Sequence, residues 1–181
     1  MDLRVFPGTP VPEGLTIHFE ADWSGGVLSL RYRLNGPVAR FRGVAESSVM
    51  GLRRDELWKT TCFEIFVRPE GSRAYWEFNF SPTGDWAFYR FDSYRQGQSS
   101  PPLKNPPLTV FKKQQGWEFS VTVDLSDQFD FKDRALVYAP AVILENGDGD
   151  KSYWALEHHR PQPDFHHPDN LVRLLLPKGP A

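Results

Sequence analysis

The sequence predicts an all-β fold, a two-sheet antiparallel β-sandwich of jelly-roll type. Short segments of alternating apolar and polar residues recur along the chain, and they are separated by many of its 16 prolines and 14 glycines. No segment carries the 3.6-residue apolar stripe of an amphipathic helix. The length of 181 residues suits one large core, so residues 1–181 are expected to form a single domain.

The clearest strand signal lies at residues 116–125, where Trp117, Phe119 and Val121 alternate with polar neighbours. About nine segments carry such a signal. In chain order the predicted strands are 15–21, 26–34, 60–69, 74–80, 85–91, 116–125, 135–145, 151–157 and 171–177. The Pro/Ser-rich segment 96–107 is predicted to be a surface loop.

Charge and cysteine content exclude several classes of partner. The formal net charge is −2, with 21 basic and 23 acidic residues, so nucleic acid is not an expected partner. No apolar run approaches the roughly 20 residues that span a bilayer, so no membrane association is expected. Cys62 is the only cysteine and the N-terminus lacks the apolar region of a signal peptide, which together predict a cytoplasmic protein.

The middle of the chain predicts a binding face. If residues 58–67 form one strand, alternate side chains from Trp58 through Glu64 share one face. A hairpin closed by "SPTG" with Phe80 opposite Asp85 would add side chains of the next two strands to that face. The predicted face carries Trp58, Glu64, Tyr75, Glu77, Asn79, Trp86 and Arg90.

This mixture of side chains suits a polyhydroxylated ligand. Aromatic rings stack on the apolar face of a sugar ring, and carboxylate, amide and guanidinium groups pair with its hydroxyls. The alternative interpretation is an ordinary half-solvated sheet face with Arg–Glu pairs.

The segments "DELWKTTCFEIFVRPEGSRAYWEFNFSPTGDWAFYRFDSYR" and "HHPDNLVRLLL" resemble the DOMON-like group of domains, which are similar to family 9 carbohydrate-binding modules and to haem-binding DOMON cytochromes. The resemblance covers nearly the whole chain. Its most specific parts are the Trp-x5-Glu spacing, the "NFSPTGDW" hairpin and the late His-Pro. It implies a two-sheet β-sandwich that binds a sugar or a haem and has no catalytic activity.

The resemblance also implies roles for single residues. Trp58 matches a sugar-stacking tryptophan and Glu64 a hydroxyl-binding carboxylate, while Asn79 and Arg90 are looser matches. Candidates for the second stacking aromatic of the carbohydrate modules are Trp154, Trp86 and Phe165. Phe63 stands where the modules have a basic residue, which puts the same sugar specificity in doubt.

The segment 157–170 contains four of the five histidines. They form two adjacent pairs, and neighbours in an extended chain point apart, so each pair offers one ligand to a given point. Three prolines stiffen the segment. It is therefore predicted to be a closing loop without a metal, with His166 and Trp154 at the rim of the binding face. Haem, with Met50 and either His158 or His166 as axial ligands, is an alternative; no cofactor is the first expectation.

No catalytic motif is present: the sequence has no Gly-rich phosphate loop, no Gly-x-Ser-x-Gly and no His-Glu-x-x-His. Glu64 and Glu77 can lie close together, as in a glycosidase, but Arg90 beside them would keep both ionised. The sequence thus predicts a non-catalytic module for a carbohydrate or similar polar ligand. The alternatives are a haem-binding domain and a module that docks on another protein through the same aromatic face.

Overall fold

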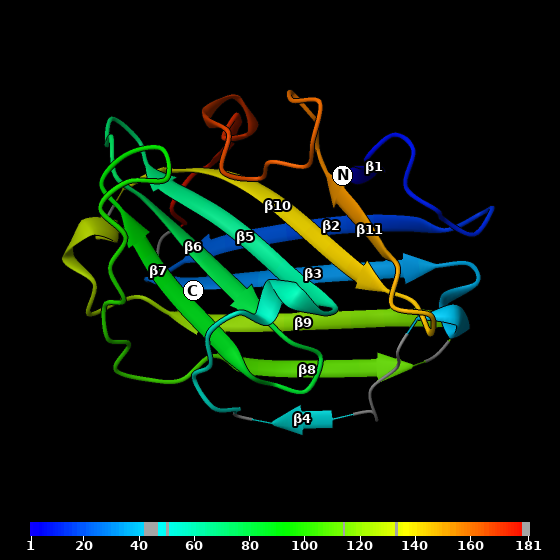
Figure 1. The fold of residues 1–181 in the computed structure, drawn as a ribbon. Coiled ribbons are helices and arrows are strands. Elements are labelled where there is room, and N and C mark those ends of the chain that lie inside the picture. Colours follow the sequence, from blue (N-terminus) through cyan, green and yellow to red (C-terminus); the bar gives the residue numbers. More distant parts are fainter. Residues whose placement is uncertain (42–46, 50, 114, 133, 179–181) are drawn as a thin grey trace.

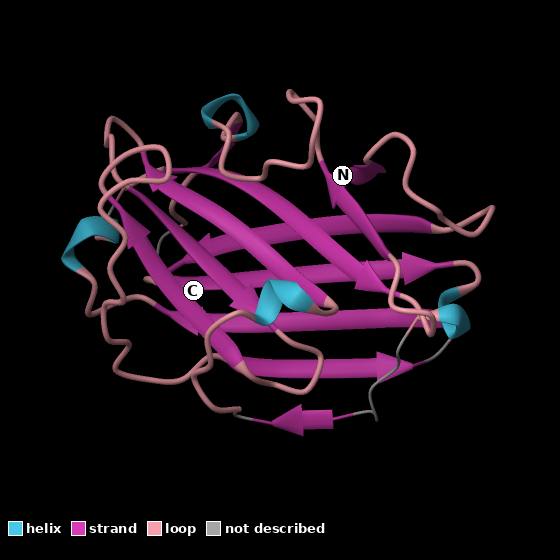
Figure 2. Ribbon diagram, viewed as in Figure 1, coloured by secondary structure: helices cyan, strands magenta, loops and turns pink. Residues whose placement is uncertain are grey.

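The fold is all-β, as predicted. The computed structural model describes residues 1–41, 47–49, 51–113, 115–132 and 134–178. Within these ranges there are strands and short 3-10 turns but no α-helix, and therefore no helix that is long and apolar enough to cross a membrane (Figure 2). The strands are β1 (Asp2–Val5), β2 (Thr16–Ser24), β3 (Val27–Asn35), β4 (Ser47–Val49), β5 (Cys62–Pro69), β6 (Tyr75–Phe80), β7 (Trp86–Phe91), β8 (Leu108–Lys113), β9 (Gly116–Asp124), β10 (Leu136–Glu145), β11 (Lys151–Ala155) and β12 (Arg173–Leu175). The 3-10 turns are η1 (Val38–Arg40), η2 (Leu57–Lys59), η3 (Phe129–Phe131) and η4 (Pro168–Asn170).

The strands form one continuous, antiparallel sheet rather than the two separate sheets that the sequence predicts. Their order is β4-β8-β9-β3-β2-β1-β11-β10-β5-β6-β7, and β12 pairs with β10. The junction is β1, because its residues Asp2 and Leu3 pair with β2 while Arg4 and Val5 pair with β11. At only four residues, β1 is too short for its period to be recognised in the sequence.

The sheet curls so that its two halves face each other. Strands β10, β5, β6 and β7 cross in front of β2, β3, β9 and β8 (Figure 1). The main core lies between these front and back halves: Phe63 of β5 stacks on Phe119 of β9 with ring centroids 4.4 Å apart. The Tyr32 hydroxyl of β3 donates a hydrogen bond of 2.7 Å to the main-chain oxygen of Glu64.

All of the predicted strands are present, with ends that differ by a few residues, and β1, β4 and β8 are additional. The register of the β6–β7 hairpin differs from the prediction by one residue. Phe80 pairs with Trp86, not with Asp85, because the connection includes Asp85, whose carbonyl accepts from the Ser81 N–H at 2.8 Å. A shift of one residue moves every side chain of a strand to the opposite face.

Two site predictions fail for this reason. Trp86 is buried in the main core between the two halves. Arg90 lies on the same side of β7. Its guanidinium carbon is 5.6 Å from the ring centroid of Trp76, and its Nη1 donates a hydrogen bond to Asp92. The outer face of β7 is formed instead by Ala87, Tyr89 and Phe91, which pair with Asn79, Glu77 and Tyr75.

The outer face of the front half is also covered. The segment between β11 and β12, residues 156–172 (the closing loop), packs on it through Phe165 and Leu171. A second, smaller apolar cluster forms there around Phe66, Tyr75 and Tyr89. The candidate site lies between this sheet face and the closing loop.

Candidate functional site

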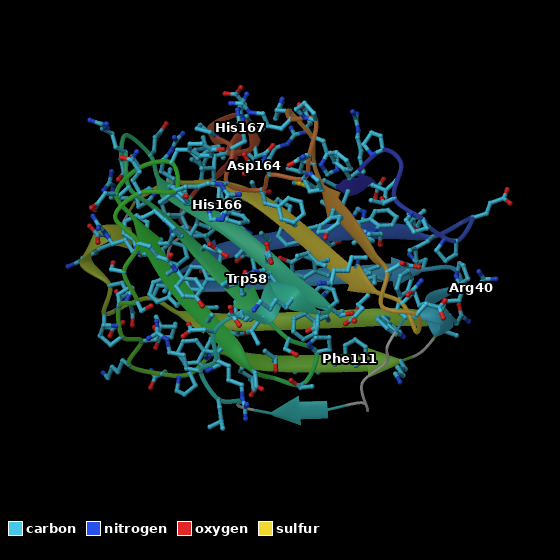
Figure 3. The ribbon with its side chains drawn as sticks, in the orientation of Figure 1. Arg40, Trp58, Phe111, Asp164, His166 and His167 are labelled. Atoms are coloured by element: carbon cyan, nitrogen blue, oxygen red, sulfur yellow. The ribbon has the colours of Figure 1, made fainter. Side chains whose placement is uncertain are left out.

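The site is a cavity of about 350 Å³ on the outer face of the front half. Figure 3 shows Trp58 of η2 and His166 of the closing loop on this face of the molecule. The volume is within the range of small-molecule pockets, roughly 300–1,000 Å³. The lining residues are Trp58, Glu64, Phe66, Glu77, Tyr89, Phe91, Arg95, Gln98, Ile143, Tyr153, Pro163, Phe165 and His166.

Trp58 stands at the mouth of the cavity. It belongs to η2 and not, as predicted, to the strand that begins at Cys62, because Glu56 adopts a left-handed conformation with φ of 64° and turns the chain. Its side chain is among the exposed large apolar groups, and its ring meets Tyr89 edge to face at 6.2 Å. The Tyr89 hydroxyl donates a 2.6 Å hydrogen bond to Asp55, which ties β7 to the segment that carries Trp58.

Glu64 lies on the floor of the cavity. It is 2% exposed, and its Oε1 atom has no hydrogen-bond partner among the residues that the structure describes. Burial raises the pKa of this carboxyl well above its usual value, and the neighbouring Glu77 raises it further, whereas the Cys62 thiol lowers it. A buried polar atom without a partner is costly, and such atoms commonly mark a position that a ligand or water fills.

Glu77 is the second carboxyl of the floor. It points to the same face of β6 as Asn79, whose Nδ2 donates a 2.7 Å hydrogen bond to Glu77 Oε1. Burial raises the pKa of Glu77 to about 7, against the lowering effects of Asn79 and Arg95. Asn79 does not line the cavity; it supports Glu77 from the side.

His166 closes the cavity from above. Its Nδ1 atom is 2.8 Å from the Tyr75 hydroxyl, which also accepts the main-chain N–H of Arg95 at 3.2 Å. With the Tyr75 hydroxyl donating to Nδ1, the ring keeps its proton on Nε2, 3.6 Å from Glu77 Oε2. Burial lowers the pKa of His166 to about 4, and the charge of Arg95 lowers it too, so the ring is neutral at pH 7.

The closing loop is tied to the segment that follows β7. Asp164 accepts hydrogen bonds from Arg95 at 2.8 Å and from the Tyr94 hydroxyl at 2.5 Å. Burial acts to raise the pKa of Asp164, but these two bonds outweigh it and lower the pKa. Asn170 donates through Nδ2 to the Asp164 main-chain oxygen at 2.9 Å, which holds the loop in its turn.

Of the nine residues predicted on the binding face or at its rim, the structure brings four together at the cavity, namely Trp58, Glu64, Glu77 and His166. Tyr75 does not line the cavity but holds His166 through its hydroxyl. Asn79 lies behind the four, and Trp86 and Arg90 are on the other face of β7. The prediction for Trp154 also fails. It points from β11 into the main core, where its Nε1 donates to Ser152 Oγ at 3.0 Å, and its neighbour Tyr153 lines the cavity instead.

Several lining residues were missed by the sequence reasoning. The correct hairpin register would have identified Tyr89 and Phe91. Phe165, one of the three candidates for the second stacking aromatic, does line the cavity. Arg95, Gln98 and Pro163 come from loops, for which residue alternation carries no signal.

The histidines outside the cavity have local contacts. His158 Nε2 is 3.0 Å from the Arg4 main-chain oxygen, and the rings of His159 and His167 stack at 5.6 Å. In the described part of the chain, no three His, Cys, Asp or Glu side chains are grouped as metal ligands. Met50, proposed above as a haem ligand, lies outside the described residues, so the haem alternative is untested.

No protein-family profile and no curated protein matches the sequence. The fold resembles solved structures. A candidate carbohydrate-binding protein from Bacteroides uniformis aligns with a TM-score of 0.66 and 16% identity over 98% of this chain and 85% of that chain. A family 9 carbohydrate-binding module from Caldicellulosiruptor kristjanssonii in complex with glucose aligns with a TM-score of 0.53 and 13% identity over 99% and 86% of the two chains. The same kind of module in complex with cellotriose gives a TM-score of 0.51 and 13% identity over 99% and 83%. At these identities the likeness concerns the fold.

Proposed function

We propose that this chain is a non-catalytic module that binds a carbohydrate in the cavity between Trp58 and the closing loop. The observation that carries the proposal is the pairing of an exposed tryptophan at the mouth with a buried carboxyl, Glu64, whose Oε1 atom has no partner on the floor. An apolar ring face and an unsatisfied acceptor are the two features that a sugar ring complements, through its C–H face and its hydroxyls.

The fold and the sequence motifs support the proposal independently. The similar solved structures include modules in complex with glucose and cellotriose. The DOMON-like membership is part of the proposal and rests on the motifs around Trp58, Glu64 and the β6–β7 hairpin. The proposal is supported by the fact that Trp58 and Glu64, the two residues of the Trp-x5-Glu spacing, both line the cavity, although Trp58 is carried by η2 and not by the strand.

Arg90 does not lie beside Glu64 and Glu77, so it does not keep these two carboxyls ionised as the sequence predicted. A retaining or inverting glycosidase uses one carboxylate that is ionised and one acid that is protonated. Burial raises the pKa of both Glu64 and Glu77, that of Glu77 to about 7, so below neutrality the neutral acid is favoured in each and the pair lacks the ionised carboxylate. We therefore expect no reducing sugar to be released from cellotriose in mildly acidic buffer.

Calorimetric titration with glucose, cellobiose and cellotriose tests the proposal. We expect saturable binding of at least one of them, and a loss of about tenfold or more in Trp58→Ala, because the stacking surface is removed. Leu174→Ala is the matched control, since Leu174 is also an exposed apolar side chain but lies on β12, outside the cavity. Binding that is equal in Trp58→Ala and in Leu174→Ala would contradict the proposed site. A protein partner captured only by the unmutated chain, with no sugar bound, would favour the docking alternative.

A further inference from the structure

The floor and walls of the cavity have an unusual charge balance. Two carboxyls, Glu64 and Glu77, are 2% and 5% exposed and lie on adjacent strands, with Glu64 opposite Asn79 and Glu77 opposite Phe66. Neither carboxyl forms a salt bridge with Lys or Arg among the described residues; the nearest ring nitrogen to Glu77 is His166 Nε2. A polyol hydroxyl would satisfy Glu64 Oε1 but would bring no positive charge to stabilise the ionised form of either carboxyl.

The groups that face the carboxyl pair do not supply the missing charge. On β5 the neighbour is the Cys62 thiol, and on β7 it is the Tyr89 phenol; both have a pKa raised by burial, and neither is cationic in any state. From the closing loop His166 is neutral at pH 7. Within the described ranges, Arg95 is the one Lys or Arg that lines the cavity, and Asp164 holds its guanidinium by a 2.8 Å bond at the rim.

The walls that surround the pair are aromatic. Trp58, Phe66 and Tyr89 line the cavity together with the carboxyls. The face of an aromatic ring carries a negative quadrupole and attracts a cation, and aromatic walls combined with carboxylates are a recurrent arrangement for ammonium groups. The aromatic walls and the carboxyl groups of the floor therefore both favour a positive charge on the ligand.

We propose that the cavity selects an amino sugar, whose protonated amine lies between the Glu64–Glu77 pair and the aromatic wall while its ring stacks at Trp58. This inference rests on the proposed carbohydrate function and adds the chemical class of the ligand. The ammonium group brings donors for Glu64 Oε1 and a positive charge for both carboxyls, and such charge-assisted hydrogen bonds are about twice as strong as those between two neutral groups.

Binding of an amino sugar should release protons from the two carboxyls. In the free protein the raised pKa of Glu77, about 7, means that this carboxyl is mostly protonated below neutrality, and the pKa of Glu64 is raised as well. An ammonium group has to displace protons from these carboxyls. Its binding therefore releases protons near pH 7 and weakens as the pH falls, whereas the binding of a neutral sugar requires no such release.

The test is isothermal titration calorimetry at pH 7 in two buffers that differ in ionisation enthalpy. The probes are glucose, glucosamine, 3-amino-3-deoxyglucose, 6-amino-6-deoxyglucose and tetramethylammonium, the last as a cation without a sugar ring. We expect at least one amino sugar to bind about tenfold or more tightly than glucose, with release of roughly one proton. In Glu64→Gln, an isostere that keeps the packing, this preference should largely disappear. In Asp148→Asn, which removes an exposed carboxylate from the β10–β11 turn, it should persist.

The other outcomes are distinct. If glucose binds as tightly as every amino sugar, or if proton release is the same for both, the amine selectivity is wrong and the carbohydrate function stands. If tetramethylammonium binds as tightly as the best amino sugar, the cavity recognises a cation and not a sugar, and the proposal fails together with the carbohydrate function. If no probe binds but cellobiose or cellotriose does, the amine selectivity is overturned and the carbohydrate function stands; if none of these ligands binds, both are overturned.

Discussion

The two faces of β5 are both buried but differ in what they bury. On the inner face Phe63, Ile65 and Val67 are fully covered by the back half of the sheet. On the outer face Glu64 and Phe66 are also buried, yet Glu64 carries an oxygen atom with no hydrogen-bond partner among the described residues. Burial alone therefore does not separate a core from a site. On β5 the two faces differ instead in the unsatisfied polar atom of Glu64, and a core that only stabilises the fold tolerates few such atoms.

The largest expected effect on stability is at β11, where Trp154 faces the main core and its neighbour Tyr153 faces the cavity. Trp154→Ala should lower the free energy of unfolding by about 3–5 kcal/mol, because it leaves a cavity in the main core. Tyr153→Ala, on the half-buried outer face, should cost less stability but weaken sugar binding. Urea unfolding and calorimetric titration of both variants measure the two effects. An exchange of these phenotypes would show that the faces of β11 are assigned the wrong way round.

A smaller effect is expected in the pH dependence of stability, where Glu77 and His166 act in opposite directions. Burial raises the pKa of Glu77 from 4.5 to about 7, so the folded state binds more protons than the unfolded state in that interval and stability falls as the pH rises. Burial lowers the pKa of His166 from 6.5 to about 4, so the unfolded state binds more protons there and stability rises with pH. Each effect is on the order of 3 kcal/mol.

Single substitutions separate the two contributions. Between pH 4.5 and 6.5 the stability of the unmutated chain should change little from this pair. Relative to the unmutated chain, Glu77→Gln should gain stability with rising pH over that interval, and His166→Gln should lose it. Thermal unfolding at a series of pH values gives the three curves. Parallel curves for all three proteins would mean that neither group is buried as the structure has it.

Much of the fold could be predicted because the strands have clear alternation, as in β9, where apolar residues face the core at every second position. The site was harder. Every residue of β6 is buried, so its two faces differ in chemistry rather than in polarity pattern, and the register of the hairpin depended on one turn residue, Asp85. That single step placed Ala87, Tyr89 and Phe91 on the outer face in place of Trp86, Phe88 and Arg90.

The sequence placed three of the cavity residues correctly, namely Trp58, Glu64 and Glu77. A carboxylate within a predicted apolar strand is unusual, which pointed to Glu64 and Glu77. Trp58 still reaches the same cavity as Glu64 although it lies in η2 and not in the strand. The contributions of Arg95, Tyr94 and Asp164 depend on contacts between segments some 70 residues apart in the chain. Local alternation contains no information about such contacts.

The most direct test of the outer-face site uses the tryptophans themselves. The chain has six, and their indole N–H groups can be followed one by one in a ¹⁵N-labelled sample by NMR, with assignments from Trp→Phe variants. During titration with a saccharide that binds in calorimetry, or with cellotriose if none does, we expect the Trp58 signal to move to saturation while those of Trp86 and Trp154 stay in place. Movement of Trp86 or Trp154 without Trp58, or no movement at all, would contradict a carbohydrate site at the outer face of the front half.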